Sequence, residues 1–197
     1  GKYQEQNDVD SVNCKFCEAG KEFTSKTTAC SVCLTGKYQD QIDAATATCG
    51  DCPTGRYLID TATTKEEHDA QIDCKFCEAG KEFTSKTTNC SVCLTGKYQD
   101  QIGAATATCG DCPNGRYLID TATTKEEHDA QIDCKFCEAG KEFTSKTTNC
   151  SVCLAGKYQE QDTQPSATCK TCSTGQYAST PSTMCQTCNN GKYQNAL

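Results

Sequence analysis

Cysteine is the residue whose number and spacing predict chemistry in this chain. All 20 cysteines among its 197 residues fall into ten C-x-x-C pairs, the first at Cys14 and Cys17 and the last at Cys185 and Cys188. Such pairs can form disulfides, hold zinc between two pairs, or act as a redox dithiol. A redox dithiol needs an exposed thiolate of low pKa at a helix start in a βαβ context, and the sequence offers no such context. The pairs therefore predict either disulfides or zinc sites.

Four features favour disulfides over zinc. The number of residues between successive pairs cycles through 12, 15 and 21, whereas zinc sites would join the pairs two by two, out of step with a cycle of three. Glycine stands three residues after the second cysteine of each pair, not directly behind it as in zinc knuckles. The basic surface that most four-cysteine zinc modules carry is missing. Finally, Asn89 and Asn149 begin N-x-S sequences, the N-glycan acceptor of secreted chains. A four-cysteine zinc array remains the alternative.

The composition leaves little material for an apolar core. Leu, Ile, Val and Phe together number 23, too few to bury a conventional core in a chain of this length. The net charge is −7, with 19 basic residues interspersed among 26 acidic ones, which argues against nucleic acid and anionic membrane surfaces as partners. No stretch approaches the roughly 20 apolar residues of a membrane span. Covalent cross-links are therefore expected to replace the core.

The chain repeats itself with a period of 60 residues. Residues 14–73 form a first repeat and return with three changes as a second repeat, residues 74–133. A third, divergent repeat at residues 134–197 keeps the cysteine rhythm, changes the residues between and ends in a partial module, and residues 1–13 form another partial module. Such periodicity is typical of a linear array in which each unit touches mainly its neighbours.

Each period divides into mini-modules of the form C-x-x-G-x-(Tyr/Phe)-loop-C. The glycines that follow the pairs are Gly20, Gly36, Gly55, Gly80, Gly96, Gly115, Gly140, Gly156, Gly175 and Gly191. All eight tyrosines follow a glycine in this way, counting Tyr3 after Gly1. The glycine predicts a backbone position with positive φ, hence a tight turn that sends the next residues into an extended strand. The aromatic ring is expected to lie against the bridge, because it is the largest apolar contact that such a module can form.

Little regular secondary structure is expected. We predict strands of two to four residues around each "GKYQ" and "GRYLID", with turns elsewhere and one helix of about two turns at "TTKEEHDAQ". Thr64 and Thr124 stand three residues before Glu67 and Glu127, which is the spacing of a capping box. So short a helix cannot be stable alone and must lean on the loop that contains it.

Sequence alone does not prove which cysteines pair, but one scheme leaves adjacent modules without a shared loop. In this ladder the second cysteine of each pair joins the first cysteine of the next pair. The bridges are then Cys17–Cys30, Cys33–Cys49, Cys52–Cys74, Cys77–Cys90, Cys93–Cys109, Cys112–Cys134, Cys137–Cys150, Cys153–Cys169 and Cys172–Cys185. Closing a 14-residue loop raises the free energy of the unfolded chain by roughly 3 kcal/mol through lost conformational entropy. No other feature of the sequence could stabilise the fold as much as nine such bridges.

Cys14 and Cys188 are left without partners in the ladder. Either the array continues beyond both ends, or Cys188 of one chain bridges to Cys14 of the next, which would give covalent multimers. Because Gly1 begins neither a signal peptide nor a translation start, we expect the chain to be processed or cut from something longer.

The module resembles a known family. A stretch such as "CLTGKYQDQIDAATATCGDC" at residues 33–52 is similar to the one-bridge module of tumour necrosis factor receptor ectodomains and to the related ephrin-receptor-like cysteine-rich repeats. The resemblance covers essentially the whole chain. It supports the ladder, because the cysteine before x-x-G is bridged in that family to the cysteine closing its own loop. It implies a small disulfide-rich fold, an elongated rod of one-disulfide mini-modules with short β-hairpins and one short helix per repeat. The interlaced two-bridge module of the receptors is absent, so cytokine binding is not implied.

These observations favour an extracellular structural protein. Near-identical modules in series present the same surface every 60 residues, which suits self-association into a filament or cell-surface appendage. Threonine-rich segments between the cysteines, such as "TSKTT", are also suited to carry O-linked glycans. We expect a secreted glycoprotein without a cofactor, and because no grouping of residues predicts catalysis, not an enzyme.

Two alternatives remain for the function. A receptor-like ectodomain would concentrate aromatic and arginine anchors on its surface, and the chain has only two arginines, Arg56 and Arg116. A metal protein could use zinc on the thiolates or calcium on the acidic "KEEHD" segments. In the second case His68 and His128 would be ligands; we expect them instead on the solvated face of the short helix.

Overall fold

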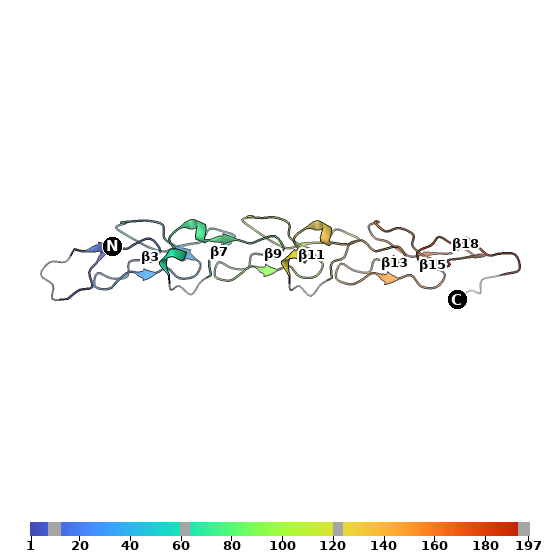
Figure 1. Ribbon diagram of the computed structural model, residues 1–197, viewed down its shortest axis with the longest axis horizontal. Helices are drawn as coiled ribbons and strands as arrows, with labels where there is room; N and C mark the ends of the chain where they lie inside the picture. The colour runs from blue at the N-terminus through green and yellow to red at the C-terminus, as the bar shows by residue number, and fades with distance from the viewer. Residues whose placement is uncertain (8–12, 60–63, 120–123, 193–197) are drawn as a thin grey trace. The chain divides into compact units, whose positions relative to one another are not determined.

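The computed structural model describes residues 1–7, 13–59, 64–119 and 124–192. Its elements are two-residue β-strands and single turns of 3-10 helix, spaced along the chain and joined by turns and loops (Figure 1). Contacts divide the chain into two compact units. The first comprises Gly1–Ser91 with Gln101–Thr108, and the second Val92–Asp100 with Cys109–Leu197.

Strands occur in both units. The first unit contains β1 (Lys2–Tyr3), β2 (Lys15–Phe16), β3 (Lys21–Glu22), β4 (Ser31–Val32), β5 (Lys37–Tyr38), β6 (Gly50–Asp51), β7 (Arg56–Tyr57), β8 (Lys75–Phe76) and β9 (Lys81–Glu82). β10 (Ser91–Val92) stands at the boundary, and the second unit contains β11 (Lys97–Tyr98), β12 (Gly110–Asp111), β13 (Lys141–Glu142), β14 (Ser151–Val152), β15 (Lys157–Tyr158), β16 (Lys170–Thr171), β17 (Gln176–Tyr177) and β18 (Gln186–Thr187).

The strands pair as antiparallel two-stranded hairpins, which confirms the predicted fold class. In the first unit β1 pairs with β2, β3 with β4, β5 with β6 and β7 with β8. In the second unit β11 pairs with β12, β13 with β14, β15 with β16 and β17 with β18. The first strand of each hairpin follows the glycine, as expected. The second strand consists of the two residues inside the next C-x-x-C pair, where turns were expected.

The glycine of each module has the predicted backbone conformation. All ten glycines have φ between +75° and +87°. In module turns such as Leu34–Lys37 the amide of Lys37 donates to the carbonyl of Leu34 at 3.0 Å, and Gly36 occupies the third position. A turn of this type needs positive φ at that position, which glycine adopts without steric cost.

Nine disulfides define the modules. We number them along the chain: module 1 (Cys17–Cys30), 2 (Cys33–Cys49), 3 (Cys52–Cys74), 4 (Cys77–Cys90), 5 (Cys93–Cys109), 6 (Cys112–Cys134), 7 (Cys137–Cys150), 8 (Cys153–Cys169) and 9 (Cys172–Cys185). Among the described residues, the buried apolar side chains other than cysteine are three alanines and two leucines. Sulfur therefore takes the place of an aliphatic core.

The predicted two-turn helix is wrong. The segment instead holds two separate single 3-10 turns, η1 (Lys65–Glu67) and η2 (Gln71–Asp73), repeated as η3 (Lys125–Glu127) and η4 (Gln131–Asp133). Thr64 makes no side-chain cap bond; the cap that forms is later, where Asp73 Oδ2 accepts from the Ala70 amide at 2.9 Å. A helix this short gains few hydrogen bonds for its nucleation cost, and contacts of His68 with the preceding module interrupt it.

Some expected features fall on residues that are not described. These are residues 8–12 of the first partial module, Asp60 and Asp120 of the two "GRYLID" segments, Thr63 and Thr123 of the two "TTKEEHDAQ" segments, and residues 193–197 of the last partial module, which include Tyr193. Within the described parts of the chain, no helix is long and apolar enough to cross a membrane.

Candidate functional site

The structure brings together the cysteines of each bridge in the ladder. Their Cα atoms lie 5.6–5.8 Å apart, and the sequence separations run 13, 16, 22 in the first two repeats and 13, 16, 13 in the third. Cys14 is an exposed free thiol and Cys188 a half-buried one. Four-cysteine zinc sites need free thiolates, which the bridged cysteines do not offer. Among the described residues, no group of three His, Cys, Asp or Glu side chains is placed to hold a metal ion.

Backbone hydrogen bonds join each module to the one after it, and modules 2 and 3 show the pattern. The Gly36 amide donates to the carbonyl of Leu58 at 2.9 Å, the Cys52 amide donates back to the Gly36 carbonyl at 2.8 Å, and the Gln39 amide donates to the His68 carbonyl at 2.9 Å. The same types of bond recur in the second unit, for example from Gly96 and Gln99. Coupling between modules therefore depends on main-chain groups.

Tyrosine side chains also reach the following module. Tyr38 of module 2 packs against the cluster formed by the module 3 bridge and Leu58. Tyr57 of module 3 packs against the module 4 bridge and Ala107, beside Phe83 of module 4 itself. In the second unit Tyr98 packs in the same way on the module 6 bridge. Aromatic rings thus pack on disulfides, as predicted. Each of these tyrosine rings, however, packs on the disulfide of the following module and not on that of its own module.

Contacts also reach two modules ahead. An added Cβ on Gly20 of module 1 would overlap the carbonyl oxygen of Lys65 in module 3, and one on Gly55 of module 3 would overlap that of Ala105 in module 5. An added Cβ on Gly36 would stand 2.9 Å from the methyl group of Thr87. Each of these glycines therefore serves the turn and also leaves room for the loop of the next module but one.

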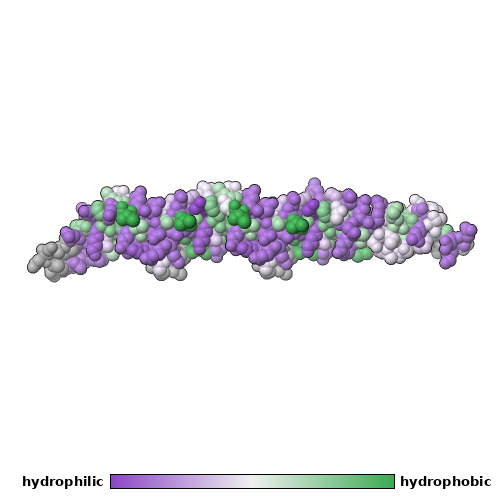
Figure 2. Space-filling model, turned by 45° about the horizontal axis from the view of Figure 1, so that its top comes forward, coloured by the Kyte–Doolittle hydropathy of each residue, from purple (hydrophilic) through white to green (hydrophobic). Residues whose placement is uncertain are grey.

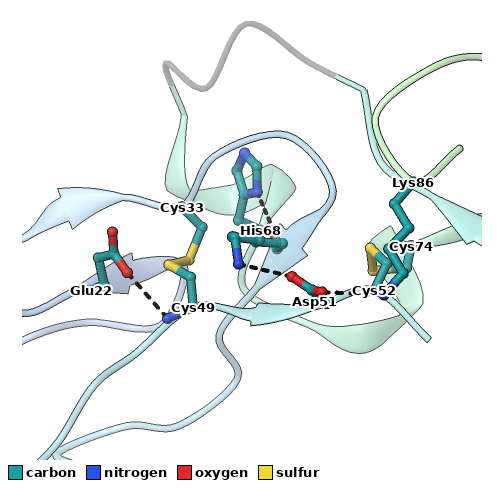
Figure 3. Close-up of polar contacts among 9 residues, drawn as sticks. Glu22, Cys33, Cys49, Asp51, Cys52, His68, Cys74 and Lys86 are labelled. Atoms are coloured by element: carbon teal, nitrogen blue, oxygen red, sulfur yellow. Dashed lines mark hydrogen bonds and ion pairs between the residues drawn. A yellow bond between two sulfur atoms is a disulfide. The ribbon is translucent and has the colours of Figure 1, made fainter.

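His68 is the buried centre of the long loop, which corrects its expected position on a solvated face. Its exposed fraction is 0%, and the same holds for His128. The ring Nδ1 lies 2.7 Å from the carbonyl oxygen of Lys37 in module 2 (Figure 3), while the backbone carbonyl accepts from Gln39. The imidazole thus links the loop of module 3 to module 2 by a hydrogen bond.

Asp51 joins module 2 to module 4. In the β5–β6 hairpin it stands opposite Lys37, whose Nζ lies 2.8 Å from Oδ1, and Lys86 Nζ lies 3.3 Å from Oδ2 (Figure 3). The hydrogen bond from Lys37, followed by that from Lys86, lowers the pKa of the Asp51 carboxyl. Asp111 has the same two partners in the second unit, Lys97 and Lys146. These pairs are exposed, so each contributes little to stability.

The surface is mostly polar, with separate apolar patches (Figure 2). Several large apolar side chains are exposed at corresponding positions of the repeats: Leu34, Leu94 and Leu154; Ile42 and Ile102; Ile72 and Ile132. Exposure of Ile42, Ile72, Ile102 and Ile132 ranges from 77% to 86%. Both arginines are used internally, because Arg56 stacks on Phe76 at 4.0 Å and Arg116 on Phe136 at 4.1 Å.

The predicted glycan acceptors are accessible. Asn89 and Asn149 are exposed, each next to the closing cysteine of its module. The first repeat carries Ala29 at this position and module 9 carries Met184.

No model of a known protein family matches the chain, and no curated protein matches it. Its classification therefore depends on its own architecture. Each described module closes one disulfide around one glycine turn, and each except module 6 adds a two-residue strand to a hairpin; module 6 has the single β-bridge Tyr117–Lys135 instead. The chain is a tandem array of cysteine-rich, one-disulfide repeats.

Proposed function

We propose that this chain is a non-enzymatic structural protein of the extracellular space, which self-associates into a fibre or a cell-surface appendage. One observation carries the proposal: within each unit, modules are joined to the next and to the next but one by the same main-chain contacts. Such an array resists local opening, because a module cannot leave its place without breaking contacts to several others.

The bridges support the extracellular location. Structural disulfides form and persist in oxidising compartments and are rare where thiols are kept reduced. The N-x-S sequences and the likeness to tumour necrosis factor receptor and ephrin-receptor-like modules point to the same location.

Recurring exposed apolar side chains support self-association. Isoleucines such as Ile42 and Ile102 stand at the same place of successive repeats, so a contact made by one repeat can be made again by the next. When such a contact joins different patches on the two partners and does not close on itself, the product is a filament. A receptor-like function is less well supported, because both arginines are stacked on aromatic rings of their own chain.

Electron microscopy and sedimentation of the oxidised chain, from high to low protein concentration, test the proposal. We expect filaments or large assemblies that dissociate on dilution, and weaker assembly in Ile42→Asp/Ile102→Asp. A Cys14→Ser/Cys188→Ser variant serves as a control, because assembly that it retains is non-covalent. If both the oxidised natural chain and the oxidised Cys14→Ser/Cys188→Ser variant remain monomeric at every concentration, self-association is contradicted.

A further inference from the structure

Each predicted glycan acceptor overlaps the closing cysteine of a bridge. The acceptor in module 7 is Asn149-Cys150-Ser151, and that in module 4 is Asn89-Cys90-Ser91. The middle residue of the acceptor is therefore the one that the disulfide holds. Closure of the bridge therefore constrains the backbone of the acceptor at its middle residue.

Folding fixes all three residues of the module 7 acceptor. The Asn149 carbonyl accepts from Thr144 Oγ1 at 3.2 Å, Cys150 is bridged to Cys137, and Ser151 pairs in β14 with Glu142 of β13. The side chains of Asn149 and Ser151 are exposed and Cys150 is half-buried, so the constraint on the acceptor lies in its hydrogen-bonded and cross-linked backbone. In module 4 the Asn89 carbonyl accepts from Thr84 Oγ1 at 3.3 Å, and Cys90 is bridged to Cys77.

The transfer reaction acts on a peptide that must leave such a structure. The asparagine Nδ2 forms a bond to the anomeric carbon of a lipid-linked oligosaccharide, the lipid pyrophosphate leaves, and the amide nitrogen loses one proton to the enzyme or solvent. An enzyme must take the asparagine and the serine two residues later into one active site. The bridged loop can present both only after local opening, and opening free energies are highest where backbone is bonded and cross-linked.

We propose that Asn89 and Asn149 are N-glycosylation sites that accept their glycan only before the bridge of their own module closes. Their occupancy is then set by the order of two events in the secretory pathway, transfer of the oligosaccharide and oxidation of the cysteine pair. The exposed asparagine side chain lets the finished module hold a glycan once it has been added. This inference rests on the proposed secreted location.

An experiment with purified components separates the inference from that location. Unglycosylated chain, produced in a bacterial host and oxidised, is incubated with oligosaccharyltransferase and a lipid-linked oligosaccharide, beside the same chain kept reduced. Occupancy at each asparagine is measured by mass spectrometry after enzymatic removal of the sugar. We expect occupancy at Asn149 at least about tenfold lower in the oxidised chain. Equal occupancy in the two forms, or none in the reduced chain, would overturn the proposal.

Two variants serve as matched controls. Cys137→Ser/Cys150→Ser opens module 7 alone, so in the oxidised state it should raise occupancy at Asn149 and leave Asn89 low. Ala29→Asn creates the same acceptor in module 1, and it should follow the pattern of the natural sites. If opening module 7 raises occupancy at both asparagines, general unfolding and not the local bridge controls transfer, and the inference fails. If only the secreted location is wrong, the native protein lacks glycans while these results still hold.

Discussion

Replacing Gly55 with alanine tests whether the module glycine makes room for the loop two modules ahead. Gly55 has φ of +76°, and an added Cβ would overlap the carbonyl oxygen of Ala105. Gly175 has φ of +80°, and no atom lies within 4 Å of its added Cβ. Positive φ costs an alanine about 1–2 kcal/mol at either position. Gly175→Ala is therefore the matched control for backbone strain.

The overlap adds a second cost at Gly55. Ala105 contributes a main-chain carbonyl, which cannot rotate away as a side chain can, so the loop of module 5 must move. Nearby, the carbonyl of Ala107 accepts from the Phe83 amide at 2.8 Å, and its side chain is buried against the module 4 bridge. Forced displacement of packed groups costs roughly 1–3 kcal/mol. We expect Gly55→Ala to lower the free energy of unfolding by about 2–5 kcal/mol, and Gly175→Ala by about 1–2 kcal/mol.

Guanidinium unfolding with the disulfides intact gives the two free energies, and native-state hydrogen exchange gives the local effect. Gly55→Ala should speed exchange of the Phe83 amide by at least about tenfold, and Gly175→Ala should leave it unchanged. If both variants lose the same stability and exchange at Phe83 does not change, the approach of the module 5 loop contributes nothing beyond the turn, and the argument for coupling across two modules is refuted.

Three further changes test other contacts. His68→Ala should destabilise the first unit by roughly 2–4 kcal/mol in thermal unfolding, because it leaves a cavity and removes a buried hydrogen bond, while the exposed Glu67→Ala should change little. The lowered pKa of Asp51 means that its ion pairs stabilise the fold above the ordinary carboxyl pKa and that this contribution is lost as pH falls below about 4; Asp51→Asn should flatten the acid limb of a stability–pH curve, and an unchanged limb would contradict the assignment. Tyr57→Ala should speed reduction of the module 4 bridge by dithiothreitol relative to Ile59→Ala, and equal rates would show that the ring does not shield it.

The features that could be predicted from the sequence are those set by spacing. Gly36 could be assigned positive φ because a glycine recurs at one offset from every pair, and hairpins followed from the extended residues after it. The strand Gly50–Asp51 could not be predicted, because neither residue favours strands. It forms because Lys37 and Tyr38 lie opposite it in the hairpin. That partnership depends on the closed bridge and leaves no local periodicity.

His68 shows the other limit. Its neighbours in "KEEHD" are charged, so the local pattern indicates a solvated helix, yet its ring is buried against Lys37, 31 residues earlier. Local helix propensity is a weak prior that a tertiary contact overrides. A signal was present in the spacing, since His68 and His128 recur at one position of an otherwise polar segment, but periodicity alone does not distinguish a buried histidine from an exposed one.

The main-chain character of the coupling explains how the third repeat can diverge without losing the architecture. Gly115 is approached by the backbone of Pro165 and Ser166, where Gly55 is approached by that of Ala105. The Gln159 amide donates to the carbonyl of Pro181 at 2.9 Å, in the place where Gln39 uses the carbonyl of His68. Since the partner is a carbonyl or an amide in each case, these particular contacts do not depend on the side chain of the loop residue, provided that the glycine and the cysteines on the other side remain.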